Sequence, residues 1–83
     1  ASSLLIDEQI ERRLSYYVTD KGIKNLTLKV SPILGAYLSR GLINSYLGKW
    51  KRKYKCKITL VESTDFTVLQ NEFYNEKGDK LDS

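Results

Sequence analysis

The sequence contains no histidine, and this absence removes several kinds of chemistry at once. Histidine is the commonest general base, the commonest metal ligand and the usual pH switch near neutrality. There is one cysteine, Cys56, so an intramolecular disulfide and a cysteine-rich zinc site are excluded. Cys56 lies in an alternating pattern, where we interpret it as a small core residue. A lone thiol also favours a cytoplasmic protein.

Long hydrophobic runs are missing as well. No stretch approaches the roughly 18 apolar residues of a membrane span, and no signal-peptide pattern opens the chain. We therefore expect no membrane partner. Methionine is absent and the chain begins at Ala1, so we interpret it as a piece of a longer protein, with a tag remnant at Ala1 and Ser2 as the other interpretation.

The totals fit one small folded unit. With 83 residues, 41% apolar and 29% charged, we expect a single domain over residues 1–83. The net charge is +4 and unevenly spread, because residues 40–57 hold seven basic side chains and no acidic one. A local basic surface suits a polyanion such as nucleic acid, or an acidic protein face.

Residues 4–20 have the periodicity of an amphipathic helix, ended by Gly22. Its apolar stripe is Ile6, Ile10, Leu14, Tyr17 and Val18, and its acidic residues Asp7, Glu8 and Glu11 are assigned to a solvated face. Residues 25–30 then alternate with Leu26, Leu28 and Val30 on one side, which predicts a half-buried strand.

A central helix is predicted from Ser31, a typical N-cap, and Pro32, which is favoured at the first helical position. The helical pattern extends to about Tyr54. Its apolar stripe comprises Ile33, Leu34, Tyr37, Leu38, Leu42, Tyr46 and Trp50. Gly35, Gly41 and Gly48 each weaken a helix by about 1 kcal/mol relative to alanine. They indicate either a break near Arg40–Gly41 or at Gly48, or close packing.

Two more strands are predicted after this helix. In residues 55–62, Cys56, Ile58 and Leu60 form the expected core face. Residues 66–74 follow a short polar turn, which favours an antiparallel hairpin with that strand. Residues 75–81 have turn chemistry around Gly78 and then an expected frayed end. The fold class is therefore α/β (α+β): helix, strand, helix, strand, strand, with the first two strands parallel in a small mixed sheet.

Catalysis has little support in this chain. There is no Cys–His pair, Ser–His–Asp set, phosphate-binding glycine loop or metal-spaced acidic cluster. We therefore expect no catalytic, cofactor-binding or metal-binding residue here.

Nucleic-acid binding has more support. Six Lys or Arg residues within nine positions can neutralise phosphates, and aromatic rings among them can stack on unpaired bases. The candidate RNA-binding residues are Lys49, Trp50, Lys51, Arg52, Lys53, Tyr54 and Lys55. The alternative is structural: the lysines form a solvated helix end and Trp50 anchors the core.

Aromatic residues leave a third hypothesis open. They are Tyr16, Tyr17, Tyr37, Tyr46, Tyr54, Tyr74 and Trp50, more than a core of this size needs. Aromatic side chains are enriched at interfaces. Equally, tyrosine rings can line the edge of a core with their hydroxyls in water.

The central stretch resembles the C-terminal small domain of the ribonuclease E/G family. Val30, Pro32, Ala36, Tyr37 and Leu38 carry the resemblance. It implies a thioredoxin-like fold without the redox motif, in a cytoplasmic endoribonuclease that acts in rRNA processing and mRNA turnover. The resemblance also implies that magnesium-binding aspartates and a zinc shared between protomers belong to upstream parts of the parent, not to this chain.

We therefore predict a non-catalytic domain that supports a homo-oligomer, with an auxiliary RNA contact through the basic segment. The alternative is a free-standing small RNA-binding module that uses residues 49–57.

Overall fold

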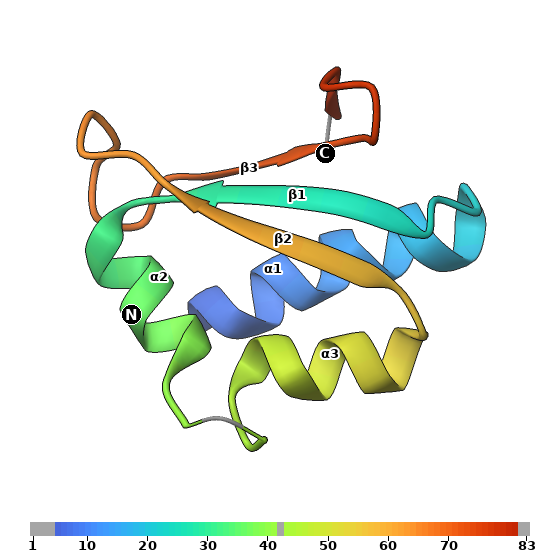
Figure 1. The fold of residues 1–83 in the computed structure, drawn as a ribbon, viewed down its shortest axis with the longest axis horizontal. Helices are drawn as coiled ribbons and strands as arrows, with labels where there is room; N and C mark the ends of the chain where they lie inside the picture. The colour runs from blue at the N-terminus through green and yellow to red at the C-terminus, as the bar shows by residue number, and fades with distance from the viewer. Residues whose placement is uncertain (1–4, 42, 82–83) are drawn as a thin grey trace.

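A computed structural model describes residues 5–41 and 43–81 of the chain. It has an α+β architecture in which helices pack on a four-stranded mixed sheet of order β2-β1-β3-β4 (Figure 1). The helical elements are α1 (Ile6–Ser15), a π-helical turn η2 (Tyr16–Asp20), α2 (Pro32–Ser39) and α3 (Tyr46–Tyr54). The strands are β1 (Asn25–Val30), β2 (Lys57–Glu62), β3 (Asn71–Tyr74) and β4 (Lys80–Leu81). The predicted fold class is confirmed.

The first helix follows its sequence pattern closely. Ile6, Ile10 and Leu14 are buried, as are Tyr17 and Val18 in the π-helical turn. Gly22 then adopts a φ of 72°, which a residue without a Cβ reaches at little cost, and the chain turns toward β1. Leu4, the predicted start of this helix, lies outside the described residues.

The strand β1 is the centre of the sheet, and its pairing with β2 is parallel as predicted. The register sets Leu26 beside Ile58 and Leu28 beside Leu60. Leu26, Leu28 and Val30 are all buried, so the predicted alternation is confirmed. The two strands run parallel because α2 and α3 return the chain to the end of the sheet at which β1 begins.

The predicted hairpin between the last two long strands is wrong. β3 pairs with β1, antiparallel, and not with β2. It begins only at Asn71, and residues 63–70 form a loop that carries the chain past the end of β1 to the other side of that strand (Figure 1). The bonds Ser63 N to Val30 O (2.8 Å) and Ser31 Oγ to Val68 O (2.6 Å) fix this loop to the end of β1. A short polar turn favours a hairpin, but here the segment after the turn pairs with β1, which lies inside the sheet, and not with the edge strand β2.

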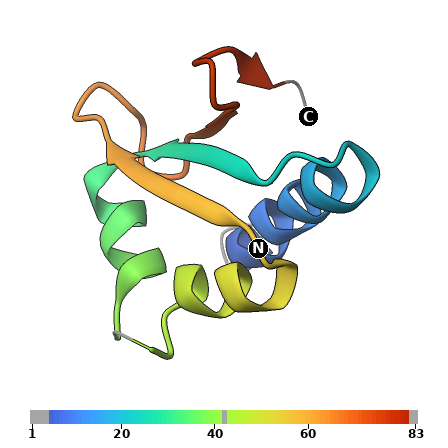
Figure 2. The same ribbon diagram turned by 45° about the vertical axis from the view of Figure 1, so that its right-hand side comes forward.

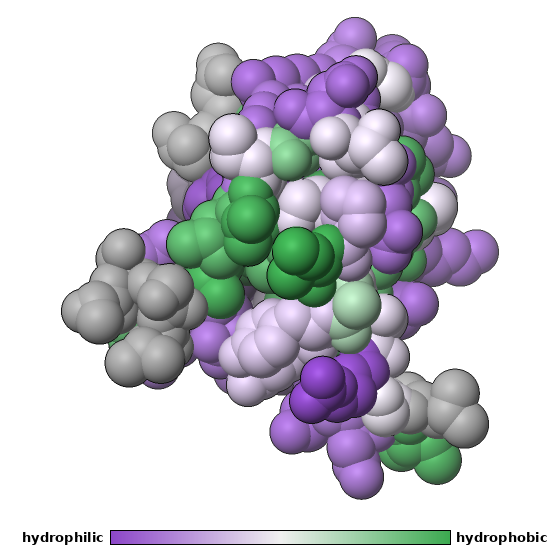
Figure 3. Space-filling view, turned by 90° about the vertical axis from the view of Figure 1, so that its left-hand side faces the viewer, coloured by the Kyte–Doolittle hydropathy of each residue, from purple (hydrophilic) through white to green (hydrophobic). Residues whose placement is uncertain are grey.

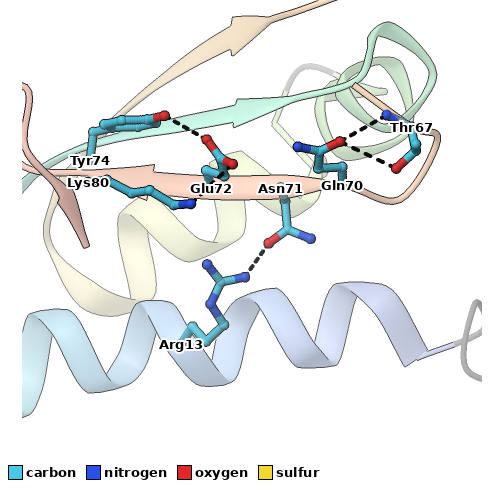
Figure 4. Close-up of polar contacts among 7 residues, drawn as sticks. All are labelled: Arg13, Thr67, Gln70, Asn71, Glu72, Tyr74 and Lys80. Carbon is cyan, nitrogen blue, oxygen red and sulfur yellow. Dashed lines mark hydrogen bonds and ion pairs between the residues drawn. The ribbon is translucent and has the colours of Figure 1, made fainter. Parts of the chain in front are cut away.

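The C-terminal segment is also more ordered than predicted. Residues 80–81 form β4, which pairs antiparallel with β3 instead of fraying. Side chains reinforce this end of the sheet: the carboxylate of Glu72 accepts a bond from the Tyr74 hydroxyl at 2.6 Å and pairs with Lys80 at 3.3 Å (Figure 4). On the helix side, Arg13 of α1 donates to Asn71 at the start of β3.

The central helix is two helices, divided near Arg40–Gly41, the first of the two predicted break points. Gly41 has a φ of 79°, a conformation suited to glycine. A second N-cap then restarts the helix, because the hydroxyl of Ser45 accepts a bond from Gly48 N at 3.0 Å. Gly48 therefore lies within the first turn of α3 and does not break it. The first N-cap is as predicted, with Ser31 Oγ 3.1 Å from Leu34 N.

All three α-helices lie on one side of the sheet (Figure 2). The core between them consists of Ile6, Ile10, Leu14, Tyr17, Val18, Leu26, Leu28, Val30, Leu34, Leu38, Leu47, Trp50, Ile58 and Phe73. β2 is an edge strand, so Cys56 and Leu60 are only half-buried while Ile58 is buried. Partial burial raises the pKa of the Cys56 thiol. Among the described residues, no helix is long and apolar enough to cross a membrane.

The end of α3 offers a small test of backbone strain. Lys55 follows the helix with φ 51° and ψ 53°, a left-handed conformation that disfavours a Cβ. We expect Lys55→Gly to raise the free energy of unfolding by about 0.5–1 kcal/mol, after the entropy cost of glycine in the unfolded chain. Lys55→Ala removes the same charge but keeps the Cβ, so urea unfolding of both variants separates strain from charge. Equal stability of the two would contradict this account.

Candidate nucleic-acid interface

The predicted basic segment forms α3 and the residues that connect it to β2. Leu47 and Trp50 point into the core. The six cations of this segment are exposed: Lys49, Lys51, Arg52, Lys53, Lys55 and Lys57. We refer to these six residues as the α3 cationic surface. Because residues 41–61 contain no acidic side chain, only residues from other elements can neutralise it.

Trp50 is part of the core, which corrects its place among the candidate RNA-binding residues. Its side chain is only 3% exposed, and its ring centroid lies 5.9 Å from that of Tyr46. A base cannot stack on a ring whose faces are already covered by protein. The structural interpretation of this residue is therefore the right one.

Tyr54 is also engaged inside the protein. Its hydroxyl donates to the carboxylate of Glu11 on α1 at 2.8 Å, and its ring is half-buried. Burial, followed by this hydrogen bond, raises the pKa of Tyr54. We infer that Tyr54 joins α3 to α1. Neither of the two aromatic candidate RNA-binding residues, Trp50 and Tyr54, therefore has a ring free to stack on a base.

The prediction that Glu11 belongs to a solvated helix face is wrong. It is half-buried, and Lys53 Nζ lies 2.8 Å from the same carboxylate oxygen that accepts from Tyr54. The hydrogen bond from Lys53, helped by those from Tyr54 and Trp50, holds the pKa of Glu11 below its ordinary value despite partial burial. Glu11 therefore fastens α1 to α3 and neutralises Lys53. Its helical periodicity alone gave no signal, because its partners lie more than 40 residues away.

The remaining cations divide into two groups. Arg52 donates to the Ile43 carbonyl at 2.8 Å, and Lys49 Nζ lies 5.9 Å from the centre of the Tyr46 ring. Lys51, Lys55 and Lys57 make no side-chain hydrogen bond or ion pair with any described residue. These three lysines are therefore the part of the surface most available to an external anion.

Protonation of Glu11 should weaken the fold at low pH. Since its folded-state pKa is lowered, its contribution to stability is present above its unfolded pKa, about 4.3. That contribution is lost as the pH falls through the lower folded-state value. We expect wild-type protein to lose more unfolding free energy between about pH 6 and 3 than Glu11→Gln does. Denaturation at several pH values measures this, and parallel curves would contradict it.

The tyrosines divide between the two interpretations left open by the sequence. Tyr17 is buried and meets Phe73 edge-on at 5.3 Å, so it belongs to the core. Tyr46, Tyr54 and Tyr74 are half-buried, while Tyr16 and Tyr37 are exposed. The hydroxyl of Tyr37 lies 3.3 Å from that of Tyr46, and this hydrogen bond is the main cause that raises the pKa of Tyr37 to about 12. Tyr37 therefore keeps its ring at the surface of α2.

Within residues 5–41 and 43–81, no group of three or more metal-ligating side chains comes together. No protein-family model, curated protein or solved structure matches this chain. The description of the α+β fold and of the α3 cationic surface therefore rests on the structure of this chain alone.

Proposed function

We propose that this chain is a non-catalytic domain of a ribonuclease E/G-like endoribonuclease that acts in rRNA processing and mRNA turnover. In this proposal the domain holds RNA through the α3 cationic surface and supports assembly of the parent as a homo-oligomer. The thioredoxin-like fold implied by the resemblance is part of the proposal. The observation that best supports the RNA contact is the group Lys51, Lys55 and Lys57, which are exposed and lack an acidic partner among the described residues.

This surface is suited to phosphates and not to bases. The two aromatic side chains that lie among these cations in the sequence are occupied, Trp50 by the core and Tyr54 by Glu11. Lysine side chains bind phosphate oxygens as flexible point charges, and such contacts carry no sequence information. The expected mode is therefore weak, sequence-independent and sensitive to salt, as an auxiliary contact within a larger enzyme requires.

A purely structural role explains part of the same charge. Lys51, Arg52 and Lys53 lie in the last turn of α3, where cations stabilise the helix dipole by about 0.3–1 kcal/mol each. Lys55 and Lys57 lie beyond the helix and gain little from that effect. RNA affinity and stability must therefore be measured on the same variants.

Titration of a short fluorescent single-stranded RNA tests the proposal. Three phosphate contacts predict a salt slope of about −2, so the affinity should fall about 20-fold between roughly 50 and 200 mM salt. Absence of binding at the lower salt concentration would contradict the RNA contact. Tight binding that persists at the higher concentration would favour a free-standing RNA-binding module over an auxiliary contact.

A further inference from the structure

Exposed apolar side chains occur on two parts of the surface. One lies on α2 and the loop after β2, where Ile33 is 65% exposed and Val68 is 52% exposed, and Figure 3 shows hydrophobic side chains gathered on this face. The other lies on β2, where Val61 is 40% exposed. A helix satisfies its own backbone groups, whereas the edge of a sheet also presents unpaired N–H and C=O groups. β2 therefore offers a partner directed hydrogen bonds as well as apolar contacts.

β2 pairs on one side only. The sheet order is β2-β1-β3-β4, so no strand among the described residues lies beyond β2 (Figure 1). Lys57 N donates to Lys24 O at 2.8 Å, and Ser63 N donates to Val30 O at 2.8 Å. Alternate residues of a strand direct their backbone groups to opposite sides, so the odd-numbered residues of β2 bond to β1. Three residues of β2 therefore direct their N–H and C=O groups away from the sheet: Ile58, Leu60 and Glu62.

This edge lacks the features that prevent strand addition in most sheets. Its register with β1 runs residue by residue from Lys57 to Glu62, without a bulge. The stretch between these two residues is Ile-Thr-Leu-Val, which contains no charge, proline or glycine and is rich in β-branched side chains. The strand at the opposite edge of the sheet, β4, comprises only Lys80 and Leu81, and a very short edge strand gives little to pair with. β2 is therefore the edge at which a further strand is favoured.

The charges at the two ends of β2 specify the ligand. Lys55 and Lys57 are exposed at its start and make no side-chain hydrogen bond or ion pair with any described residue. Glu62 is exposed at its end and is likewise unpaired among the described residues. A complementary extended segment has acidic residues beside the two lysines and a basic residue beside Glu62. Its middle is apolar and β-branched, so that it packs against the exposed Thr59 and Val61.

We propose that the outer edge of β2 binds an extended segment of another protein as an additional strand, with acidic residues of that segment beside Lys55 and Lys57. The segment runs antiparallel to β2, because antiparallel pairing is slightly more stable per residue. Its backbone exchanges hydrogen bonds with Ile58, Leu60 and Glu62. Main-chain bonds of this kind supply affinity, and alternate side chains supply specificity. The inference depends on neither the RNA contact nor the assembly of the parent with copies of itself.

Amide hydrogen exchange in the full chain tests where such a segment binds. The probe is a capped peptide with a lysine, then alternating valine and threonine, then a pair of glutamates. Binding should slow exchange of the Ile58, Leu60 and Glu62 amides at least about tenfold, because these gain partners. The amides of Thr59 and Val61 already bond to β1 and should change little. Peptide that does not associate, or that associates without this alternation, would overturn the proposal.

The same measurement without peptide distinguishes a second copy of this chain as the occupant. Exchange of the three outward amides should not depend on protein concentration. Slowing of these amides at raised protein concentration would show that the edge pairs with itself, and this result would overturn the proposal.

Leu60→Pro tests the hydrogen bonds directly. The substitution removes a donor that points outward, so it costs no bond to β1. It should weaken peptide binding about tenfold or more, whereas the matched control Leu60→Val keeps the N–H and should stay within about twofold of wild type. Far-UV circular dichroism checks that both variants fold. Equal affinity of the two folded variants would overturn strand addition at β2.

The charge pattern is tested without any change to the strand's backbone. A second peptide has the same middle but opposite charges at both ends, and it should bind wild type at least about tenfold more weakly at low salt. The double variant Lys55→Glu with Lys57→Glu should prefer this charge-reversed peptide instead. Equal affinity of both peptides for both proteins would overturn the assignment of an acidic segment. RNA is absent from these assays, so failure of the RNA contact would not be mistaken for failure of the strand pairing.

Discussion

Replacement of Trp50 by alanine should lower the free energy of unfolding by about 3–5 kcal/mol. The side chain is 3% exposed and lies between α3 and the rest of the core, so its loss leaves a large cavity as well as lost apolar burial. A small domain has only about 5–15 kcal/mol of stability in total. The variant should therefore unfold at a much lower urea concentration than wild type, and a loss below about 1 kcal/mol would contradict the core assignment.

A second substitution separates the core role of Trp50 from RNA binding. Trp50→Leu keeps an apolar side chain in the core but has no ring, and it should leave RNA affinity within about twofold of wild type when both proteins are folded, a free-energy difference below about 0.5 kcal/mol. Loss of a stacked tryptophan would have a larger effect, because base stacking contributes about 1–3 kcal/mol per base. A large loss of affinity in a stably folded Trp50→Leu protein would show that the ring reaches the RNA.

The sequence predicted helices and strands well where the spacing of apolar residues matched the face that is buried in the fold. The strand β1 runs from Asn25 to Val30 as expected, because its alternating residues face a helix layer on one side only. The cap at Ser31 and the stop at Gly22 follow from backbone chemistry that needs no tertiary partner. Such features depend on neighbours within a few positions, and sequence contains them directly.

Pairing between strands was harder to predict because it depends on distant competition. The segment after β2 was expected to fold back on β2, yet β3 lies on the other side of β1. There Phe73 becomes fully buried, and its ring meets Tyr17 and the Arg13 guanidinium. A place against β2 would leave this ring at the edge of the sheet. Burial of one large apolar side chain stabilises a fold by about 1.5–3 kcal/mol, and this gain favours the place beside β1.

The candidate site was predicted in its position but not in its composition. A run of lysines marks a charged surface wherever the helix lies, so the cationic character of residues 49–57 was readable from sequence. The burial of Trp50 and the bonds from Tyr54 and Lys53 to Glu11 depend on how α1 packs against α3. The exposed apolar face of α2 was also not predicted, because Ile33 and Tyr37 lie next to the buried Leu34 and Leu38 in the sequence and were assigned to the same apolar stripe.

Charge reversal on α3 has the largest expected effect on binding. Lys51→Glu, Lys55→Glu and Lys57→Glu together should lower the affinity for single-stranded RNA by about 100-fold at low salt, because three attractive contacts become repulsive. The control is Lys21→Glu, Arg40→Glu and Lys77→Glu, three exposed cations outside the α3 cationic surface. Both triple variants change the net charge equally, so a difference between them reports position and not total charge.

The RNA contact on α3 is best tested by the slope of log affinity against log salt concentration, measured for wild type and these two triple variants. Wild type and the control variant should each have a slope near −2, and the α3 variant should have a slope near zero. Equal slopes and equal loss of affinity in both triple variants would mean that only net charge matters. That result would contradict a specific RNA contact on α3.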